Sequence, residues 1–127
     1  MAIKTLTGEF CWNELITPDV AKAKDFYGKL LGWTYQEHDV GLMTYTMIKA
    51  SDKDVGGMMS APKEQNTPPT WMSYISVDNL EDTLSQAESL GGRVIMSATA
   101  VGDYGKFGII QDPTGAHISF WKSLKDC

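Results

Sequence analysis

The spacing of apolar residues predicts one helix early in the chain. Between positions 20 and 31 the apolar side chains recur every three or four residues and form one stripe: Ala23, Phe26, Tyr27, Leu30 and Leu31. The preceding residues Thr17-Pro18-Asp19 offer a proline for the first turn and a capping side chain, and Gly32 is the residue expected at a left-handed C-terminus. We therefore expect a helix over residues 20–31.

Short stretches of β-favouring residues surround this helix. The segment FCWNELIT (10–17) is rich in aromatic and branched side chains and predicts a strand. Three further strands are expected at 34–38, 43–49 and 55–60, because Gly41 and Ser51-Asp52 mark turns between them. The first half of the chain thus reads as strand, helix and three strands.

The second half repeats this order. We expect a strand at 71–77, a helix at 79–90 with one apolar side, and strands at 93–97, 106–111 and 116–122. The segment 97–106 reads as a loop that could act as a flap, and DPTG (112–115) as a turn. Residues 61–70 contain three of the five prolines and predict a linker.

Sequence similarity between the halves supports the same division. TPDVAKAKDFYGKLLGW (17–33) is echoed by SVDNLEDTLSQAESLGG (76–92) at an offset of 59, and YTMI (45–48) by FGII (107–110) at an offset of 62. A repeat present only twice indicates paired modules with a cleft between them rather than a solenoid. We predict an α+β fold of two βαβββ modules in a single domain (1–127), with module one at about 8–60, the linker at 61–70 and module two at about 71–123.

Composition narrows the class of protein. The chain has 127 residues and a hydrophobic content of 43%, as expected for one globular domain. Its net charge of −5 disfavours nucleic acid and anionic membranes as partners. It has no apolar run of the length of a membrane span and no charged leader. Cys11 and Cys127 show no disulfide or metal-binding spacing, which favours a reducing compartment, and we expect a cytoplasmic location.

The motifs WNEL, TPD, AKDFYGKLLGW, VGG, SVDNL, LGG and DPTGAHISFW, in this order, resemble the vicinal oxygen chelate superfamily. That group includes glyoxalase I, bleomycin-resistance proteins, ring-cleaving dioxygenases and methylmalonyl-CoA epimerase, and the resemblance covers residues 10–121, closest to an uncharacterised glyoxalase-like branch. It implies a U-shaped mixed sheet around a central cavity and often a homodimer. In many members the cavity holds a divalent metal through four His, Glu or Gln ligands, one from the first and one from the last strand of each module.

The positions equivalent to those metal ligands can be checked one by one. They fall on Trp12, Met72, Ser119 and a site near Gly57, with Met59 as its in-phase neighbour. Tryptophan cannot ligate, glycine has no side chain, and a thioether is too soft for Mg²⁺, Mn²⁺ or Fe²⁺. We therefore expect the usual metal site to be absent and predict no metal and no cofactor.

Strand parity predicts which side chains line the cavity instead. The ligand-binding candidates are Trp12, Glu14, Tyr45, Met47, Met72, Tyr74, Phe107, His117, Ser119 and Trp121. The same parity places Cys11, Leu15, Ile75, Val77, Ile118 and Phe120 on the opposite face, against the helices. An aromatic, methionine-rich wall with few polar groups is typical of a small-molecule pocket, although the same residues could simply fill the cavity as core.

Three functions remain open at this point. The chain could bind a small, partly aromatic ligand without a metal. It could be an enzyme of lyase, isomerase or dioxygenase type, using Glu14 and His117 as an acid–base pair or a relocated metal. It could also be a regulatory or interaction module with a filled cavity. Against the acid–base pair, Glu14 could accept structural hydrogen bonds and His117 could sit at the rim beside the turn.

Overall fold

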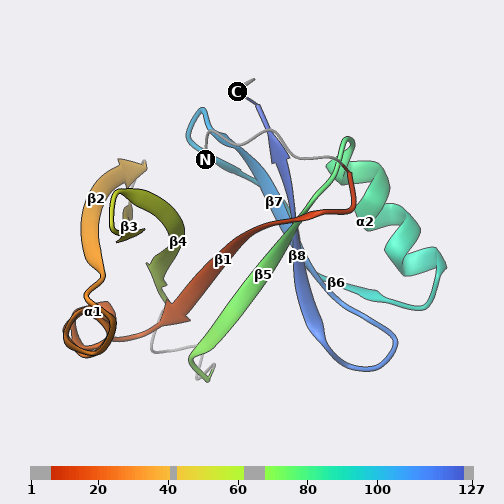
Figure 1. Ribbon diagram of the computed structural model, residues 1–127. Coiled ribbons are helices and arrows are strands. Elements are labelled where there is room, and N and C mark those ends of the chain that lie inside the picture. The colour runs from red at the N-terminus through yellow and green to blue at the C-terminus, as the bar shows by residue number, and fades with distance from the viewer. Residues whose placement is uncertain (1–6, 41–42, 62–67, 125–127) are drawn as a thin grey trace. The chain divides into compact units, whose positions relative to one another are not determined.

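The computed structural model describes residues 7–40, 43–61 and 68–124 (Figure 1). Its elements follow in the order β1 (Phe10–Thr17), α1 (Val20–Leu31), β2 (Thr34–Val40), β3 (Met43–Ala50), β4 (Lys53–Ser60), β5 (Thr70–Ser76), α2 (Leu80–Ser89), β6 (Arg93–Val101), β7 (Gly105–Gln111) and β8 (His117–Ser123). Each half therefore has the predicted order of one strand, one helix and three strands. Neither helix is long and apolar enough to cross a membrane, as far as the described residues extend.

The residues divide into two compact units. The first unit comprises 13–72, and the second comprises 1–12 together with 73–127. The first residues of β1 therefore belong to the second unit, where the Gly8 N–H donates to the Ser76 carbonyl and the Ser76 N–H donates to the Glu9 carbonyl, each at 2.8 Å.

In the first unit the strands lie in the order β2-β3-β4-β1. β1 runs parallel to β4, whereas β2, β3 and β4 are antiparallel neighbours. Leu15, Ile48 and Met58 are buried on the face that α1 covers, so the strands meet the helix through alternate residues. The Asp19 carboxylate accepts from the Lys22 N–H at 3.0 Å, and Gly32 ends the helix at φ 75°, so both predicted ends of α1 are confirmed.

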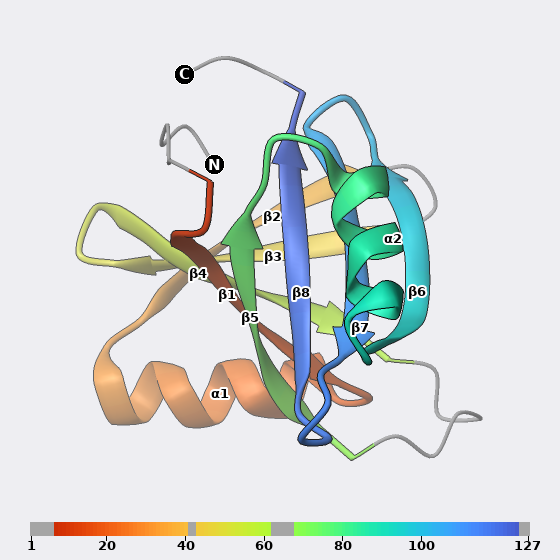
Figure 2. The ribbon, with the colours of Figure 1, turned by 90° about the vertical axis from the view of Figure 1, so that its right-hand side faces the viewer.

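In the second unit the order is β5-β8-β7-β6, with β5 parallel to β8 and the other pairs antiparallel. Figure 2 shows α2 lying across one face of these strands. Leu80 and Leu84 of the helix pack with Val77 and Ile110 to form the buried core of the unit. The helix approaches β7 closely, because a Cβ added at Gly108 would come within 2.9 Å of a Leu84 methyl carbon.

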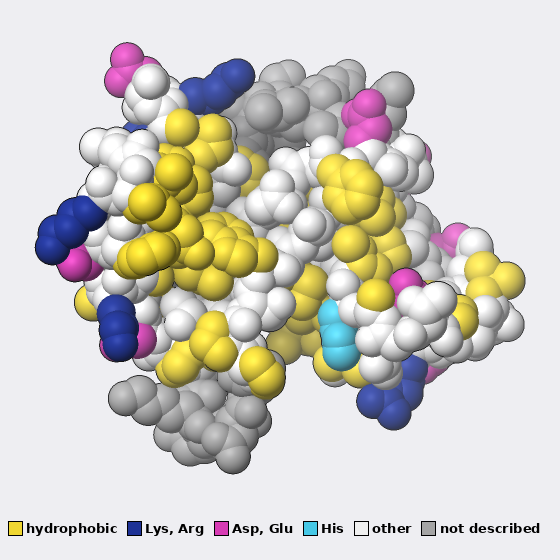
Figure 3. Space-filling view, turned by 60° about the horizontal axis from the view of Figure 1, so that its bottom comes forward, with side chains coloured by type: hydrophobic (Ala, Val, Ile, Leu, Met, Phe, Trp, Pro, Cys, Tyr) yellow, Lys and Arg dark blue, Asp and Glu magenta, His cyan; other side chains and the backbone are white. Residues whose placement is uncertain are grey.

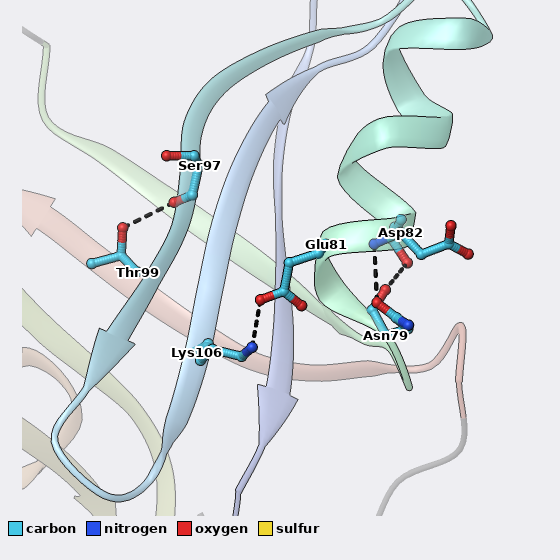
Figure 4. Close-up of polar contacts among 7 residues, drawn as sticks. Asn79, Glu81, Asp82, Ser97, Thr99 and Lys106 are labelled. Carbon is cyan, nitrogen blue, oxygen red and sulfur yellow. Dashed lines mark hydrogen bonds and ion pairs between the residues drawn. The ribbon is translucent and has the colours of Figure 1, made fainter.

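Polar contacts hold α2 at its N-terminus (Figure 4). The Asn79 side chain caps the helix by accepting from the Asp82 N–H at 3.0 Å. Lys106 of β7 forms an ion pair with Glu81, and its hydrogen bond holds the pKa of the Glu81 carboxyl below its usual value. The helix is thus tied to the neighbouring strand by charge as well as by packing.

One expectation about these elements is wrong. Segment 97–106 is no open loop, because β6 continues to Val101, a short turn follows, and β7 begins at Gly105. The register between β6 and β7 shifts twice, at Val94/Met96 and at Met96/Thr99, and such bulges break the alternation that marks a strand in sequence. The apolar stripe of α1 is present as predicted, and none of the helix residues is fully buried.

The linker expected at 61–70 falls largely on residues 62–67, which lie outside the described part of the chain, and Thr70 already belongs to β5. The α+β class and the two βαβββ modules are confirmed, together with the face that each strand turns toward its helix. We define the inner face of a unit as the sheet face opposite its helix.

Candidate functional site

The inner face of the first unit carries a row of three residues across three strands. Glu14 of β1 lies opposite Gly57 of β4, and Gly57 lies opposite Met47 of β3. Their neighbours Leu15, Met58 and Ile48 point to the helix side, so the row itself belongs to the inner face. The Glu14 side chain is buried, with 4% of its surface exposed. A carboxyl group is therefore held away from water beside a glycine.

Tyr45 occupies the space above that glycine. A Cβ built on Gly57 would overlap the phenol hydroxyl and the ring end of Tyr45, with the ring Cε2 atom 2.7 Å away. The family resemblance puts one of its four metal-ligand positions near Gly57, with Met59 as the in-phase neighbour. The tyrosine leaves no room for a side chain at Gly57 itself. Parity predicted that Tyr45 lines this face, but the pairing with Gly57 has no signal in the sequence.

The inner face of the second unit carries aromatic side chains around one serine. Tyr74 of β5 lies opposite Ser119 of β8, and Ser119 lies opposite Ile109 of β7. One row along, Trp121 lies opposite Phe107, whose ring meets the Tyr74 ring edge-on at 6.2 Å between centroids. These side chains share the face that parity assigned to them.

Ser119 has a fully buried hydroxyl without a partner. None of its surface is exposed, and its Oγ is the one side-chain oxygen or nitrogen, among the described residues, that is buried with no hydrogen bond. Leaving such a group unsatisfied costs about 1–3 kcal/mol. Nothing in the sequence distinguishes this serine from one that bonds to a neighbouring strand.

His117 and Glu14 are placed by different units. His117 opens β8 in the second unit, where it is exposed and lies opposite Gln111, whereas Glu14 belongs to the first unit. The turn before His117 is held by the Asp112 carboxylate, which accepts from the Thr114 hydroxyl at 2.6 Å and from the backbone N–H of Thr114 and Ala116. These bonds, that from the Thr114 hydroxyl above all, lower the pKa of Asp112. The acid–base pair of Glu14 and His117 remains a prediction.

The residues at the family's metal positions do not fit a hard cation. Trp12 and Met72 are buried, each 7% exposed, and offer an indole and a thioether, Ser119 offers one neutral hydroxyl, and Gly57 lies under Tyr45. Elsewhere in the described ranges, no three His, Cys, Asp or Glu side chains gather in a way that could hold a metal.

Cys11 is a poor candidate for a catalytic nucleophile. Burial raises the pKa of the Cys11 thiol, so the reactive thiolate is disfavoured at neutral pH.

Comparison with known families identifies the superfamily to which the chain belongs. Residues 9–120 match the family model described as the Glyoxalase/Bleomycin resistance protein/Dioxygenase superfamily. The chain belongs to this superfamily. The resemblance drawn from the motifs is thereby confirmed over nearly the whole sequence.

Two relatives illustrate the range of this superfamily. The chain is 34% identical over 116 residues to a protein of Mycobacterium bovis provisionally named glyoxylase CFP32, covering 88% of this chain and 44% of the relative. It is 30% identical over 129 residues to the anthracycline biosynthesis protein DnrV of Streptomyces peucetius, covering 91% of this chain and 47% of the relative. The chain therefore spans about half the length of the curated relatives it matches.

Solved structures share the fold. Methylmalonyl-CoA epimerase from Mycobacterium tuberculosis superimposes with a TM-score of 0.66 at 14% identity, over 98% of this chain and 94% of the epimerase chain. The H200C variant of homoprotocatechuate 2,3-dioxygenase from B. fuscum gives a TM-score of 0.58 at 20% identity, over 92% of this chain and 33% of the dioxygenase. At these identities the likeness establishes the fold and leaves the chemistry to the site residues.

Proposed function

We propose that this glyoxalase-superfamily chain binds a small, partly aromatic molecule at the inner faces of its modules, without a metal. The observation that supports it most is the kind of residue at the positions where the resemblance expects metal ligands: Trp12, Met72 and Ser119 are buried and offer an indole, a thioether and a hydroxyl. Near the fourth position, Tyr45 fills the space over Gly57. Side chains of this kind suit a ring system with few polar groups, because aromatic side chains supply stacking area and isolated hydroxyls fix the orientation.

Each inner face offers a hydroxyl that would form hydrogen bonds with polar groups of a ligand. The Ser119 Oγ makes no hydrogen bond in the protein, so a ligand oxygen or nitrogen that reached it would satisfy a buried group. On the inner face of the first unit, the Tyr45 phenol lies over Gly57. The name of the relative DnrV supports the aromatic part of the proposal, since anthracyclines are planar, oxygen-rich ring systems.

Ligand-induced stabilisation tests the proposal. Purified protein is screened by thermal denaturation against daunorubicin as the anthracycline, simpler hydroxylated aromatics, and phenylglyoxal as an aromatic dicarbonyl. A ligand at a hundred times its Kd adds about 2.7 kcal/mol, which corresponds to a rise of about 10 °C for a chain of this size. If no compound of any class raises the melting temperature, the ligand-binding function is lost and the filled-cavity interaction module is favoured.

A matched pair of tyrosine variants locates the site. Tyr45→Phe removes a hydroxyl from the inner face. Tyr35→Phe removes a hydroxyl from the helix side, where the Tyr35 phenol donates to the Lys24 carbonyl at 3.0 Å. We expect Tyr45→Phe to weaken binding of a hydroxylated ligand by roughly tenfold and Tyr35→Phe to leave it unchanged. Equal effects of the two variants would place the ligand elsewhere.

Metal independence is measured separately. Binding should survive extensive dialysis against EDTA, and elemental analysis of the untreated protein should find divalent metal well below one equivalent. Stoichiometric metal, or binding that disappears with the chelator and returns with Mg²⁺, Mn²⁺ or Fe²⁺, would contradict this part of the proposal.

An enzymatic function is the second candidate, and the burial of Glu14 is what favours it. A carboxyl group on the inner face is suited to proton transfer with a substrate bound there. If the chain turns over a dicarbonyl or an enolisable substrate, Glu14→Gln should abolish the reaction with the fold intact. His117→Ala should do the same only if the two residues act as a pair; full activity of that variant would leave Glu14 acting alone or with another partner.

A further inference from the structure

The Glu14 carboxyl lies away from water, unlike the acidic side chains at the surface. On the face shown in Figure 3, Asp and Glu side chains lie at the surface, several of them beside a Lys or Arg side chain. Glu14 is buried, with 4% of its surface exposed, and it belongs to the inner face of the first unit. A buried carboxylate has to be hydrogen-bonded or paired, because it has lost its hydration. The group that faces Glu14 therefore determines what this face can bind.

The Tyr45 phenol lies within reach of this carboxyl. Glu14 and Gly57 are direct partners in the parallel pair of β1 and β4, so side chains at the two positions start from the same face. A Cβ built on Gly57 would overlap the Tyr45 hydroxyl, so the phenol oxygen lies where a side chain of β4 would begin. Neighbouring strands are about 4.8 Å apart, which puts the phenol oxygen about 5 Å from the Glu14 Cβ. The rest of the glutamate side chain is long enough to bring the carboxylate within hydrogen-bond distance of the phenol.

The neighbouring side chains of the first unit favour Tyr45 as the donor to Glu14. Alternation along β4 and β3 places Val55, Met59 and Met47 on the inner face around Gly57. Among the described side chains of these two strands next to Glu14, the Tyr45 phenol is thus the one with a hydrogen-bond donor.

His38 is the alternative partner of Tyr45. It lies opposite Tyr45 in the antiparallel pair of β2 and β3, and it is half-buried. The strands follow in the order β2-β3-β4-β1, and the phenol oxygen lies over Gly57 of β4. The Tyr45 side chain therefore extends away from His38 and toward Glu14.

We propose that the Tyr45 phenol donates a hydrogen bond to the Glu14 carboxylate across Gly57, and that this pair selects ligands that carry an aromatic hydroxyl group. A phenol is a much weaker acid than a carboxylic acid, so at neutral pH the proton of such a pair stays on the tyrosine. Hydrogen bonds to an ionised acceptor are also stronger than those between neutral groups. The selectivity rests on the ligand-binding function proposed above, whereas the hydrogen bond itself does not.

The hydrogen-bonding capacity that remains in the pair defines the class of ligand. A carboxylate has only acceptor sites, and a tyrosine that has donated its proton offers only the lone pairs of its oxygen. Both groups therefore accept, and the ligand has to supply the donor, which an aromatic hydroxyl does. A methyl ether cannot donate, and an aromatic acid brings a second negative charge beside Glu14. Phenols and catechols should therefore bind in preference to their ethers and to aromatic acids.

A double-mutant cycle tests the hydrogen bond on the full chain without ligand. Glu14→Leu removes the carboxyl and keeps a side chain of similar size. Tyr45→Phe should lower the melting temperature in the wild type by several degrees and change it little in the Glu14→Leu background. Tyr35→Phe is the matched control, because the Tyr35 phenol donates to the Lys24 carbonyl on the helix side, so its effect should be the same in both backgrounds.

Carbon NMR of protein labelled at the tyrosine ring Cζ gives a second readout, which does not depend on the folding of Glu14→Leu. Glu14→Gln keeps an acceptor but removes its charge, so the Tyr45 Cζ signal should move upfield while that of Tyr35 stays in place. Additive losses in the cycle with an unmoved Tyr45 signal overturn the hydrogen bond. Coupling of Tyr45→Phe to His38→Gln in place of Glu14→Leu overturns it in favour of His38.

Three matched aromatic compounds test the ligand class by NMR titration: catechol, its dimethyl ether veratrole, and benzoate. Catechol should bind the wild type at least about tenfold more tightly than the other two, and this preference should fall to within about threefold in Tyr45→Phe and Glu14→Leu. Equal binding of veratrole or benzoate overturns the selectivity, and so does a preference that survives both substitutions. Absence of catechol binding overturns it as well. If no compound of the thermal screen binds either, the ligand-binding function itself is lost, and the ligand-free cycle still decides the hydrogen bond.

Discussion

Removing the Ser119 hydroxyl should stabilise the protein. The Oγ atom is fully buried and makes no hydrogen bond, so the folded state carries the cost of desolvating a hydroxyl that the unfolded chain exposes to water. That cost is about 1–3 kcal/mol. Ser119→Ala leaves a gap of one oxygen atom, whose lost packing offsets part of the gain. We expect a net increase of about 1 kcal/mol in the free energy of unfolding.

The effect is large enough to measure by two methods. With an unfolding entropy of about 2.1 cal/mol/K per residue, 1 kcal/mol corresponds to a rise of about 4 °C in melting temperature for 127 residues. Urea denaturation should show a higher midpoint. The slope of the unfolding free energy against urea concentration should not change, because the substitution hardly alters the surface exposed on unfolding. Both measurements are made without ligand, since a ligand that satisfies the hydroxyl would reverse the comparison.

Thr17→Val is the matched control. Thr17 is also buried, with 7% of its surface exposed, but its hydroxyl accepts a hydrogen bond from the Asp19 N–H at 3.3 Å at the start of α1. Its replacement removes a partner from the helix terminus and should lower the free energy of unfolding by about 1 kcal/mol. The two hydroxyl deletions should thus have opposite signs. If Ser119→Ala is destabilised as much as the control, the Ser119 hydroxyl has a partner and the reasoning fails.

Three further substitutions follow from close contacts and charges. Gly57→Ala should lower stability by about 2 kcal/mol because the new methyl group displaces the Tyr45 phenol, and the penalty should largely vanish in a Tyr45→Ala background; additive losses in this double-mutant cycle would mean that the two residues do not share the space. Gly105→Ala should cost about 3 kcal/mol, since its Cβ would lie 2.5 Å from the Lys122 carbonyl oxygen and 2.6 Å from the Trp121 ring, and a near-neutral melting temperature would contradict it. The pKa of Asp112 is lowered by the Thr114 hydroxyl and the turn amides, so its contribution to stability is present above the unfolded value of 3.8 and is lost as pH falls through the folded pKa. Asp112→Asn should therefore melt below the wild type at pH 7 and match it in strong acid, and a difference in melting temperature that is independent of pH would refute the charge argument.

Local signals in the sequence determined where the elements begin and end. β1 spans 10–17 and α1 spans 20–31, as predicted, because their boundaries depend on residues next to each other: a capping Asp19 at one end of the helix and Gly32 at the other. The faces of the strands were equally predictable, since side chains alternate with a fixed period of two. Leu15 and Ile118 lie against their helices for that reason.

The tertiary structure decided the features that depend on residues distant in sequence. The length of β6 follows from hydrogen bonds to β7 that continue through two bulges, and a bulge removes the period on which strand prediction relies. Whether Ser119 finds a hydrogen-bond partner depends on every strand around it. Tyr45 fills the space over Gly57 because an antiparallel pairing brings β3 beside β4.

The apolar stripe of α1 shows most clearly what the sequence pattern predicts and what the tertiary structure decides. Apolar spacing predicted that α1 is amphipathic, but the spacing cannot say how much of the apolar surface the sheet will cover. Val20 and Ala23 pack on the sheet, whereas Phe26 and Leu30 remain more than half exposed. The sequence thus determined the fold class and the two modules. Which apolar residues of α1 pack against the core and which remain exposed was decided by how the helix lies on its sheet.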